Sequence, residues 1–281
     1  MTESTQTLSS LPGVNCLLMG PAGTGKTFSI GTLVDSGLDV FFLPLESGME
    51  SLLGYFTDRG KPLPPNLQWC DPIRSTGSFT ELLDSAKKAN TMNLEALSKI
   101  ADPNRGKHNA YIKVLETLNN FVSSRDGKSY GPVNEWTSQR VLVVDGLTGL
   151  ANAAMAMIIG GKPVRNQADW GIAQGYVESI LRLLCDSCSC HFILLAHVER
   201  ETDPVLGGVK IMASALGKAL APKLPSMFSD VILADRKGTA WAWDTANLQA
   251  DLKTRNLPIS QNNPADFRPI IQKWKSRGAQ N

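Results

Sequence analysis

Gly20-Pro21-Ala22-Gly23-Thr24-Gly25-Lys26-Thr27 fits the pattern G-x-x-x-x-G-K-[ST] and decides the fold of this chain. In this pattern the glycines let successive backbone N–H groups turn inward around a row of phosphates. The ammonium group of Lys26 would lie on the β- and γ-phosphates, and the hydroxyl of Thr27 would bind Mg²⁺. We therefore expect a nucleoside triphosphate, ATP, to contact the residues from Gly20 to Phe28.

The segments on both sides of this loop support a functional assignment. Val14 to Met19 is a short apolar run typical of a buried strand, and the apolar residues after Lys26 follow helical spacing. The N-terminus of that helix would point at the phosphates, where backbone N–H groups and the helix dipole favour negative charge. A glycine-rich turn that matches by chance is the alternative, and the order strand, loop, helix makes it the weaker one.

Bulk composition sets limits on the class of protein. The chain has 281 residues, which is enough for one large domain. Its net charge of +2 is too weak to indicate nucleic-acid binding, so any DNA contact must come from a local patch. The first residues are polar, no apolar run approaches the ~18 residues of a membrane helix, and the five cysteines suit reduced thiols. We expect a cytoplasmic protein without a membrane partner.

A second predicted strand ends in a carboxylate. Asp39 to Glu46 follows the first helix, and a strand, a helix and a strand in this order imply a parallel unit. Ligands of such sheets bind beyond the carboxyl ends of the strands, so Glu46 would lie beside the γ-phosphate. There it could act as the general base that orients the attacking water. A solvated carboxylate or a helix cap is the alternative, and Glu50 is a weaker candidate for the base.

A third predicted strand, Arg140 to Asp145, is an apolar run that also ends in a carboxylate. Downstream of a phosphate loop, such an Asp holds the Mg²⁺ shell on the side opposite Thr27. The next residue is Gly146, whereas many AAA+ and helicase ATPases have an acidic pair at this point. The general base must then come from elsewhere, which favours Glu46.

A further apolar strand, His191 to His197, would place an imidazole beside the phosphates. His197 could sense the γ-phosphate and pass its state to the next loop, or it could cap the strand or bond to a neighbour. The segment from Val198 to Leu216 is charged, contains glycine and lacks periodicity, so we expect a mobile loop. We also expect a flexible segment between Leu147 and Asp169.

Two cations near the C-terminus share one side of a predicted strand. Lys253 and Arg255 are two positions apart, so their side chains point the same way. Two cations projecting together suit a phosphate group bound by a neighbouring subunit, where they would neutralise charge during phosphoryl transfer. A surface pair that protects an edge strand from aggregation is the alternative.

We divide the chain into a flexible tail over residues 1–12, a core over 13–260 and a C-terminal tail over 261–281. Helical spacing on both sides of a polar break predicts helices inserted into the core at about 78–138. This insertion is locally basic, which suits a DNA-facing surface or a solvated face. The residues that make it basic include Lys87, Lys88, Lys99, Arg105, Lys107 and Lys113.

The order of these parts resembles the RecA/DnaB-type ATPase core rather than AAA+ ATPases or GTPases. The shared parts are the phosphate loop, a strand-tip Glu, an apolar strand ending in Asp, a strand ending in a polar residue and a C-terminal K-x-R. The stretches DGLTGL, LAHVERETD and DLKTRNLP are also similar to phage-encoded RecA-like ATPases of single-strand annealing and recombination. The resemblance covers most of the chain but not the 85–138 insertion.

The resemblance implies an α/β fold with a mainly parallel central sheet flanked by helices, and it implies roles for individual residues. The strand-tip Glu activates water, the polar residue after the next strand senses the γ-phosphate, and the K-x-R pair acts across a subunit interface. The residues that take these roles or bind the nucleotide and Mg²⁺ are Lys26, Thr27, Glu46, Asp145, His197, Lys253 and Arg255. In the family the sensor is usually Gln, so His197 is a departure.

The family's two DNA-binding loops correspond here to residues of about 154–168 and 198–216. The basic residues in them, Lys162, Arg165, Arg200 and Lys210, are the expected contacts to the phosphates of single-stranded DNA. The chain would then form a ring or filament of copies with ATP at each junction.

Two alternatives stay open. One is a ring-forming helicase or translocase motor, and the other is a nucleotide-switched adaptor that recruits a single-strand-binding protein. The adaptor hypothesis draws on an apolar strip, Ile270, Ile271 and Trp274, that lies among basic residues near the end of the chain. The same strip also suits a last helix packed on the core.

Overall fold

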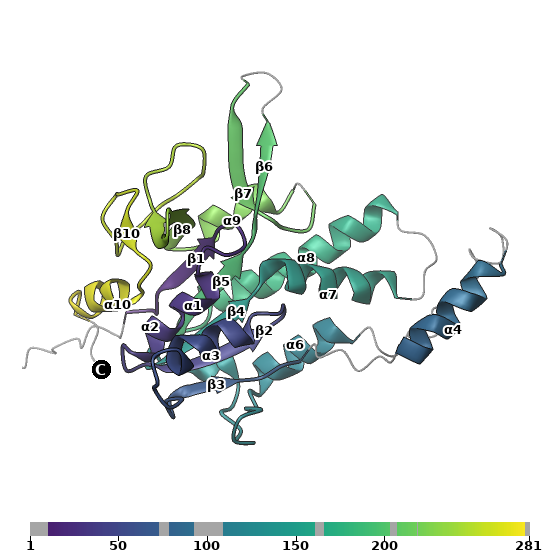
Figure 1. Ribbon diagram of the computed structural model, residues 1–281, viewed down its shortest axis with the longest axis horizontal. Coiled ribbons are helices and arrows are strands. Elements are labelled where there is room, and N and C mark those ends of the chain that lie inside the picture. The colour runs from purple at the N-terminus through teal and green to yellow at the C-terminus, as the bar shows by residue number, and fades with distance from the viewer. Residues whose placement is uncertain are drawn as a thin grey trace, which may run out of the picture.

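The computed structural model describes residues 11–72, 79–92, 109–160, 166–202, 207–217 and 219–278. Within these residues an eight-stranded sheet has the order β10-β9-β8-β1-β5-β4-β2-β3 (Figure 1). The strands from β8 to β3 in this order are parallel to one another. β9 runs antiparallel to both of its neighbours, β8 and β10. The strands of the sheet are β1 (Asn15–Met19), β2 (Asp39–Pro44), β3 (Leu67–Trp69), β4 (Arg140–Asp145), β5 (His191–Ala196), β8 (Asp230–Lys237), β9 (Ala240–Asp244) and β10 (Asn263–Pro264).

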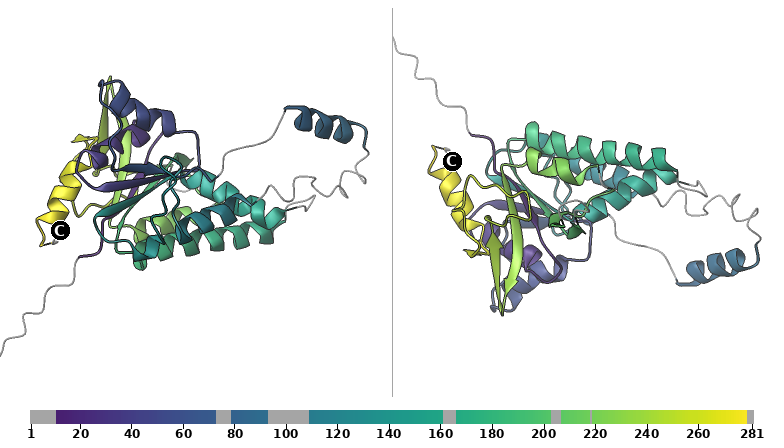
Figure 2. Two further views of the ribbon diagram at one scale, coloured as in Figure 1. Left: turned by 90° about the horizontal axis from the view of Figure 1, so that it is seen from below. Right: turned by 90° about the horizontal axis from the view of Figure 1, so that it is seen from above.

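Helices cover both faces of this sheet (Figure 2). One face carries α1 (Lys26–Ser29), α2 (Gly31–Val34), α3 (Met49–Thr57) and α10 (Arg268–Lys275). The other carries α6 (Ala110–Asn119), α7 (Leu147–Ile159), α8 (Gln167–Asp186) and α9 (Leu224–Met227), and short 3-10 turns lie at Val133–Glu135 and Ala221–Lys223. Successive residues of β1 alternate between the two cores: Leu17 packs with α7 and α8, and Leu18 packs with α2 and α3. The expected α/β fold with a mainly parallel central sheet flanked by helices is confirmed.

Within the described residues of the expected insertion, the structure forms the α-helices α4 (Phe79–Asn90) and α6. α6 buries Tyr111 and Val114 against the core. α4 lies apart from the two layers in both views of Figure 2, and Phe79 at its start is 91% exposed. Lys99, Arg105 and Lys107 lie outside the described residues.

The expectation of a flexible segment between Leu147 and Asp169 is wrong for the part that the structure describes. α7 continues to Ile159, because small and apolar side chains such as Ala154 and Met155 remain buried against the sheet and α8. α8 then begins with a capping box, in which the side chains of Asn166 and Asp169 each accept a hydrogen bond from the other's backbone N–H. Lys162 and Arg165 lie outside the described residues.

The segment expected as an irregular loop over 198–216 forms an antiparallel hairpin instead. Its strands are β6 (Val198–Thr202) and β7 (Val209–Ala213), which project from the body of the molecule (Figure 1). The base of the hairpin is anchored because β7 buries Ile211, Met212 and Ala213, whereas Thr202 and Val209, which pair farther out, are exposed. β6 is polar or charged after Val198, so the segment lacks the apolar alternation over its full length that would have indicated strands.

Residues 261–281, expected as a C-terminal tail, contribute β10 and α10 to the folded core. Ile270 and Ile271 are fully buried, and Trp274 donates a hydrogen bond of 2.9 Å from Nε1 to the Pro12 carbonyl. The apolar strip therefore packs against the sheet, beside Phe267, rather than facing a partner. Among the described residues, the structure shows no helix both long and apolar enough to cross a membrane.

Candidate nucleotide site

The glycine-rich loop leaves the carboxyl end of β1 and turns into α1. Gly23 and Gly25 have φ angles of 77° and 74°, a conformation that favours glycine. The buried ammonium of Lys26 lies inside the loop and donates hydrogen bonds of 2.7 Å to the Gly20 carbonyl and 2.9 Å to the Pro21 carbonyl. Burial lowers the pKa of Lys26, and the nearby carboxylates of Asp145 and Glu46 act in the opposite direction. The loop thus places one cation where a row of phosphates would bind.

Thr27 and Asp145 meet beside this loop, although they come from α1 and from the end of β4. The Thr27 hydroxyl donates a hydrogen bond of 2.8 Å to Oδ2 of Asp145. Burial raises the pKa of Asp145 to about 6, and the hydrogen bond from Thr27 acts in the opposite direction. A hydroxyl and a single carboxylate suit Mg²⁺, which takes few protein ligands and keeps phosphates and waters as the others. A cation here would also favour the ionised form of the buried carboxyl.

Glu46 and His197 contact each other near Asp145. Because β4 lies between β2 and β5, their carboxyl ends bring the two side chains to one edge of the sheet. Oε2 of Glu46 lies 3.2 Å from Nε2 of His197, and Oε1 accepts a hydrogen bond of 2.8 Å from the backbone N–H of Gly149. Glu46 therefore caps the first turn of α7 and also faces the site.

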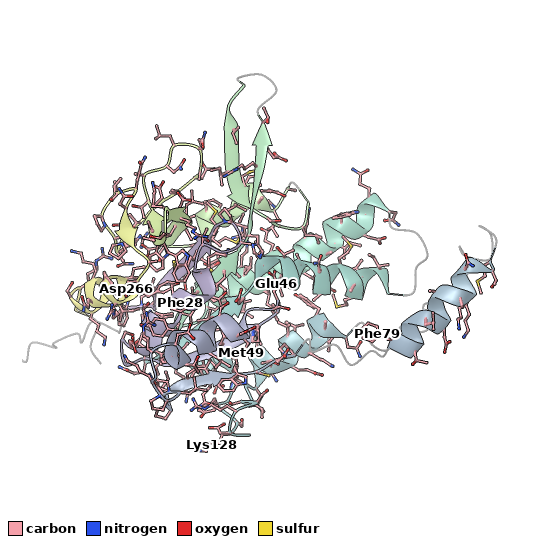
Figure 3. All side chains as sticks on the ribbon, viewed as in Figure 1. Phe28, Glu46, Met49, Phe79, Lys128 and Asp266 are labelled. Atoms are coloured by element: carbon pink, nitrogen blue, oxygen red, sulfur yellow. The ribbon has the colours of Figure 1, made fainter. Side chains whose placement is uncertain are left out.

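An open cavity of about 830 Å³ joins these groups. Its walls are the phosphate loop, the tips of β2, β4 and β5, one side of α3 and Trp241. Figure 3 shows Phe28 on the α10 side of this region and Glu46 on the α7 side. Glu50 of α3 lines the same cavity. The sequence did not indicate that Trp241 lines the cavity, because Trp241 belongs to no motif and its strand is distant in the chain from the phosphate loop.

The structure does not bring Lys253 and Arg255 to the phosphate loop of their own chain. Lys253 pairs with Val231 through backbone hydrogen bonds, and the backbone N–H of Arg255 donates 2.9 Å to Oδ1 of Asp230. Asp230 is the first residue of β8, opposite Cys16 of β1, whereas the loop follows the carboxyl end of β1. Both cations are exposed, and they lie toward the other end of the sheet.

Arg200 and Lys210 both lie on the β6–β7 hairpin but on opposite faces of it. The register pairs Arg200 with Ile211 and Glu201 with Lys210, and cross-strand partners share a face. Lys210 also lies 2.9 Å from a carboxylate oxygen of Asp251. The two expected DNA contacts that the structure describes therefore do not form a single surface.

Residues 13–256 match the family model described as AAA domain. Among solved structures the chain is similar to the RadB recombinase, with 14% identity, a TM-score of 0.36, and coverage of 87% of this chain and 93% of that one. It is also similar to the assembled ATPase EscN of the enteropathogenic E. coli type III secretion system, with 15% identity, a TM-score of 0.37, and coverage of 79% of this chain and 43% of that one. For the flagellar accessory protein FlaH from Methanocaldococcus jannaschii, the identity is 12%, the TM-score is 0.35, and the coverage is 87% of this chain and 84% of that one. No curated protein sequence matched.

The family match spans most of the chain and includes every residue that lines the cavity. A buried lysine within a glycine-rich loop and a hydroxyl–carboxylate pair beside it fit the binding of ATP and Mg²⁺. The expectation of a P-loop ATPase is confirmed at this level. The chain belongs to the AAA domain family of P-loop ATPases.

Proposed function

We propose that this ATPase acts on single-stranded DNA in recombination or strand annealing, and that its β6–β7 hairpin responds to the nucleotide. The observation that supports this proposal is the position of His197. Its Nε2 contacts the catalytic candidate Glu46, while its carbonyl accepts a hydrogen bond of 2.7 Å from Ser214 at the base of the hairpin. Because β6 starts at the next residue, a displacement of His197 moves the hairpin directly.

In the proposed reaction each side chain has one task. Lys26 holds the β- and γ-phosphates, and Thr27 with Asp145 would hold Mg²⁺, which screens the negative charge of the phosphates when bound. Glu46 accepts a hydrogen bond from the attacking water and orients it toward the γ-phosphorus. The Gly149 N–H and His197 fix the Glu46 carboxylate, so that it is already in place before the water binds.

A Glu46→Gln variant is expected to bind ATP as the parent does and to lose about a hundredfold or more in kcat. The amide keeps an oxygen for the Gly149 N–H but cannot polarise water as a carboxylate does. Glu50→Gln is the matched control, because Glu50 lines the same cavity on the exposed side of α3. Turnover of both variants is measured by phosphate release, and a larger loss in Glu50→Gln would show that the base has been assigned to the wrong residue.

Lys253 and Arg255 act in the proposed mechanism on a nucleotide bound by a neighbouring copy. Their exposure and their distance from their own loop support this arrangement. The segment that carries them is fixed by Asp230, whose carboxylate accepts hydrogen bonds from the backbone N–H groups of Arg255 and Asn256 and from the side chain of Thr254. A fixed backbone with two exposed cationic side chains suits the recognition of a phosphate across an interface.

The DNA part of the proposal is tested by the rate of ATP hydrolysis with and without single-stranded DNA. We expect the DNA to raise kcat, because a strand bound to the hairpin would act on His197, which directly precedes β6. Arg200→Ala should weaken this stimulation, whereas Lys210→Ala should change it less, because Lys210 already pairs with Asp251. An unchanged rate in the presence of DNA would favour the adaptor hypothesis, and directional unwinding of forked DNA would favour a helicase motor.

A further inference from the structure

Trp241 of β9 makes direct contact with the phosphate loop. Its indole Nε1 donates a hydrogen bond of 3.1 Å to the carbonyl of Gly23. The ring also lies against Gly25 so closely that a Cβ added there would be 2.4 Å from ring atom Cδ2. The loop therefore contacts the Trp241 side chain at both Gly23 and Gly25. A side chain at position 25 would displace the indole ring.

Trp241 also contacts an aromatic residue of α1, which in turn contacts one of α3. Phe28 packs edge-on against Trp241 with ring centroids 4.9 Å apart, and against Tyr55 of α3 at 5.1 Å. The guanidinium of Arg59 lies 3.8 Å from the centroid of the Tyr55 ring. The start of α1 is thus packed between β9 and α3, which both contribute residues to the lining of the cavity.

Trp243 provides an internal comparison, because it lies on the same strand two residues further along and so points to the same face. Trp243 is fully buried against Phe267, and its Nε1 has no hydrogen-bond partner among the described residues. Trp241 is 39% exposed and lines the cavity. Burial in the core explains the second tryptophan, but it does not explain why the first is directed at the loop.

We propose that Trp241 is a positioning residue that holds the phosphate loop in its binding conformation. This inference rests on the nucleotide site described above and deepens it. A loop with glycines at positions 20, 23 and 25 has many accessible backbone conformations when free. A hydrogen bond to Gly23 and a ring against Gly25 remove part of that freedom before the ligand binds, so that less is lost on binding.

The test compares ligands that share phosphates but differ in the nucleoside. ATP and inorganic tripolyphosphate, each with Mg²⁺, are titrated by calorimetry into the parent, Trp241→Phe, Trp241→Ala and Trp243→Phe. Because phenylalanine keeps a ring but loses the N–H, Trp241→Phe should weaken binding of both ligands about two- to tenfold. Trp241→Ala should weaken both further, on the order of thirtyfold. Trp243→Phe loses an N–H that bonds to nothing in the described chain and should leave both affinities within about twofold.

Two outcomes would overturn the inference. Unchanged affinities in both Trp241 variants would show that the loop needs no support from β9. Weaker ATP binding with unchanged tripolyphosphate binding would show that Trp241 contacts the nucleoside instead of holding the loop. Trp241→Phe keeps the test decisive even if the alanine variant unfolds. A parent that binds neither ligand would contradict the nucleotide site itself, which is a different failure.

Discussion

A Lys26→Ala variant is expected to lose ATP hydrolysis completely and most of its affinity for ATP. Lys26 is the only cation among the residues that line the cavity in the described part of the chain, apart from His197 when protonated. Its ammonium lies at the centre of the loop, so its removal leaves the charge of the β- and γ-phosphates without a partner from this chain. Calorimetric titration with ATP and a phosphate-release assay measure the two losses.

Lys128→Ala is the matched control for this experiment. Lys128 is an exposed lysine far from the cavity (Figure 3), so its removal changes the net charge equally without affecting the site. Thermal unfolding of both variants shows whether the fold is intact. Normal turnover in Lys26→Ala would mean that the triphosphate binds somewhere other than the glycine-rich loop.

The second large effect is expected for Arg255→Ala, which should bind ATP normally but hydrolyse it at least about a thousandfold more slowly. The side chain of Arg255 lies toward the far end of the sheet from its own loop, so truncation leaves binding within one chain untouched. Supplied to a neighbouring site, the guanidinium would neutralise charge that develops during phosphoryl transfer. Steady-state kinetics and ATP titration on the same preparation separate the two effects.

Arg182→Ala serves as the control, because Arg182 is an exposed arginine of α8 that pairs locally with Glu178. Its removal should cost little, as is usual for surface ion pairs. If Arg255→Ala weakens ATP binding as much as turnover, the residue acts on the ground state or on the fold rather than on the transferred phosphoryl group.

The positions of the phosphate loop and of the three polar residues at the strand ends could be predicted from the sequence, because each of these features is local. The phosphate loop is a continuous motif, and Glu46, Asp145 and His197 each follow an apolar run. Parallel strands bring their carboxyl ends to one edge, so the convergence of these three residues follows from the strand order alone. The direct contact between Glu46 and His197 adds a detail that depends on side-chain geometry.

The features that the sequence did not reveal depend on contacts between distant segments. The β6–β7 hairpin is held by backbone pairing and by Ile211 at its base, and its charged residues lack strand periodicity. α7 forms where a flexible segment was expected, because its small residues pack against α8, a partner that follows later in the chain. Trp241 reaches the phosphate loop only because β9 pairs with β8, which in turn pairs with β1.

The proposed junction between copies is tested most directly by mixing two inactive variants. Lys26→Ala retains Arg255, and Arg255→Ala retains the phosphate loop, so a junction can combine the intact half of each. In an equimolar mixture that assembles at random through a head-to-tail interface, about a quarter of the junctions would be complete. We expect the mixture to recover about that fraction of the parent ATPase rate. A mixture that stays as inactive as its components would contradict the claim that one copy completes the site of the next.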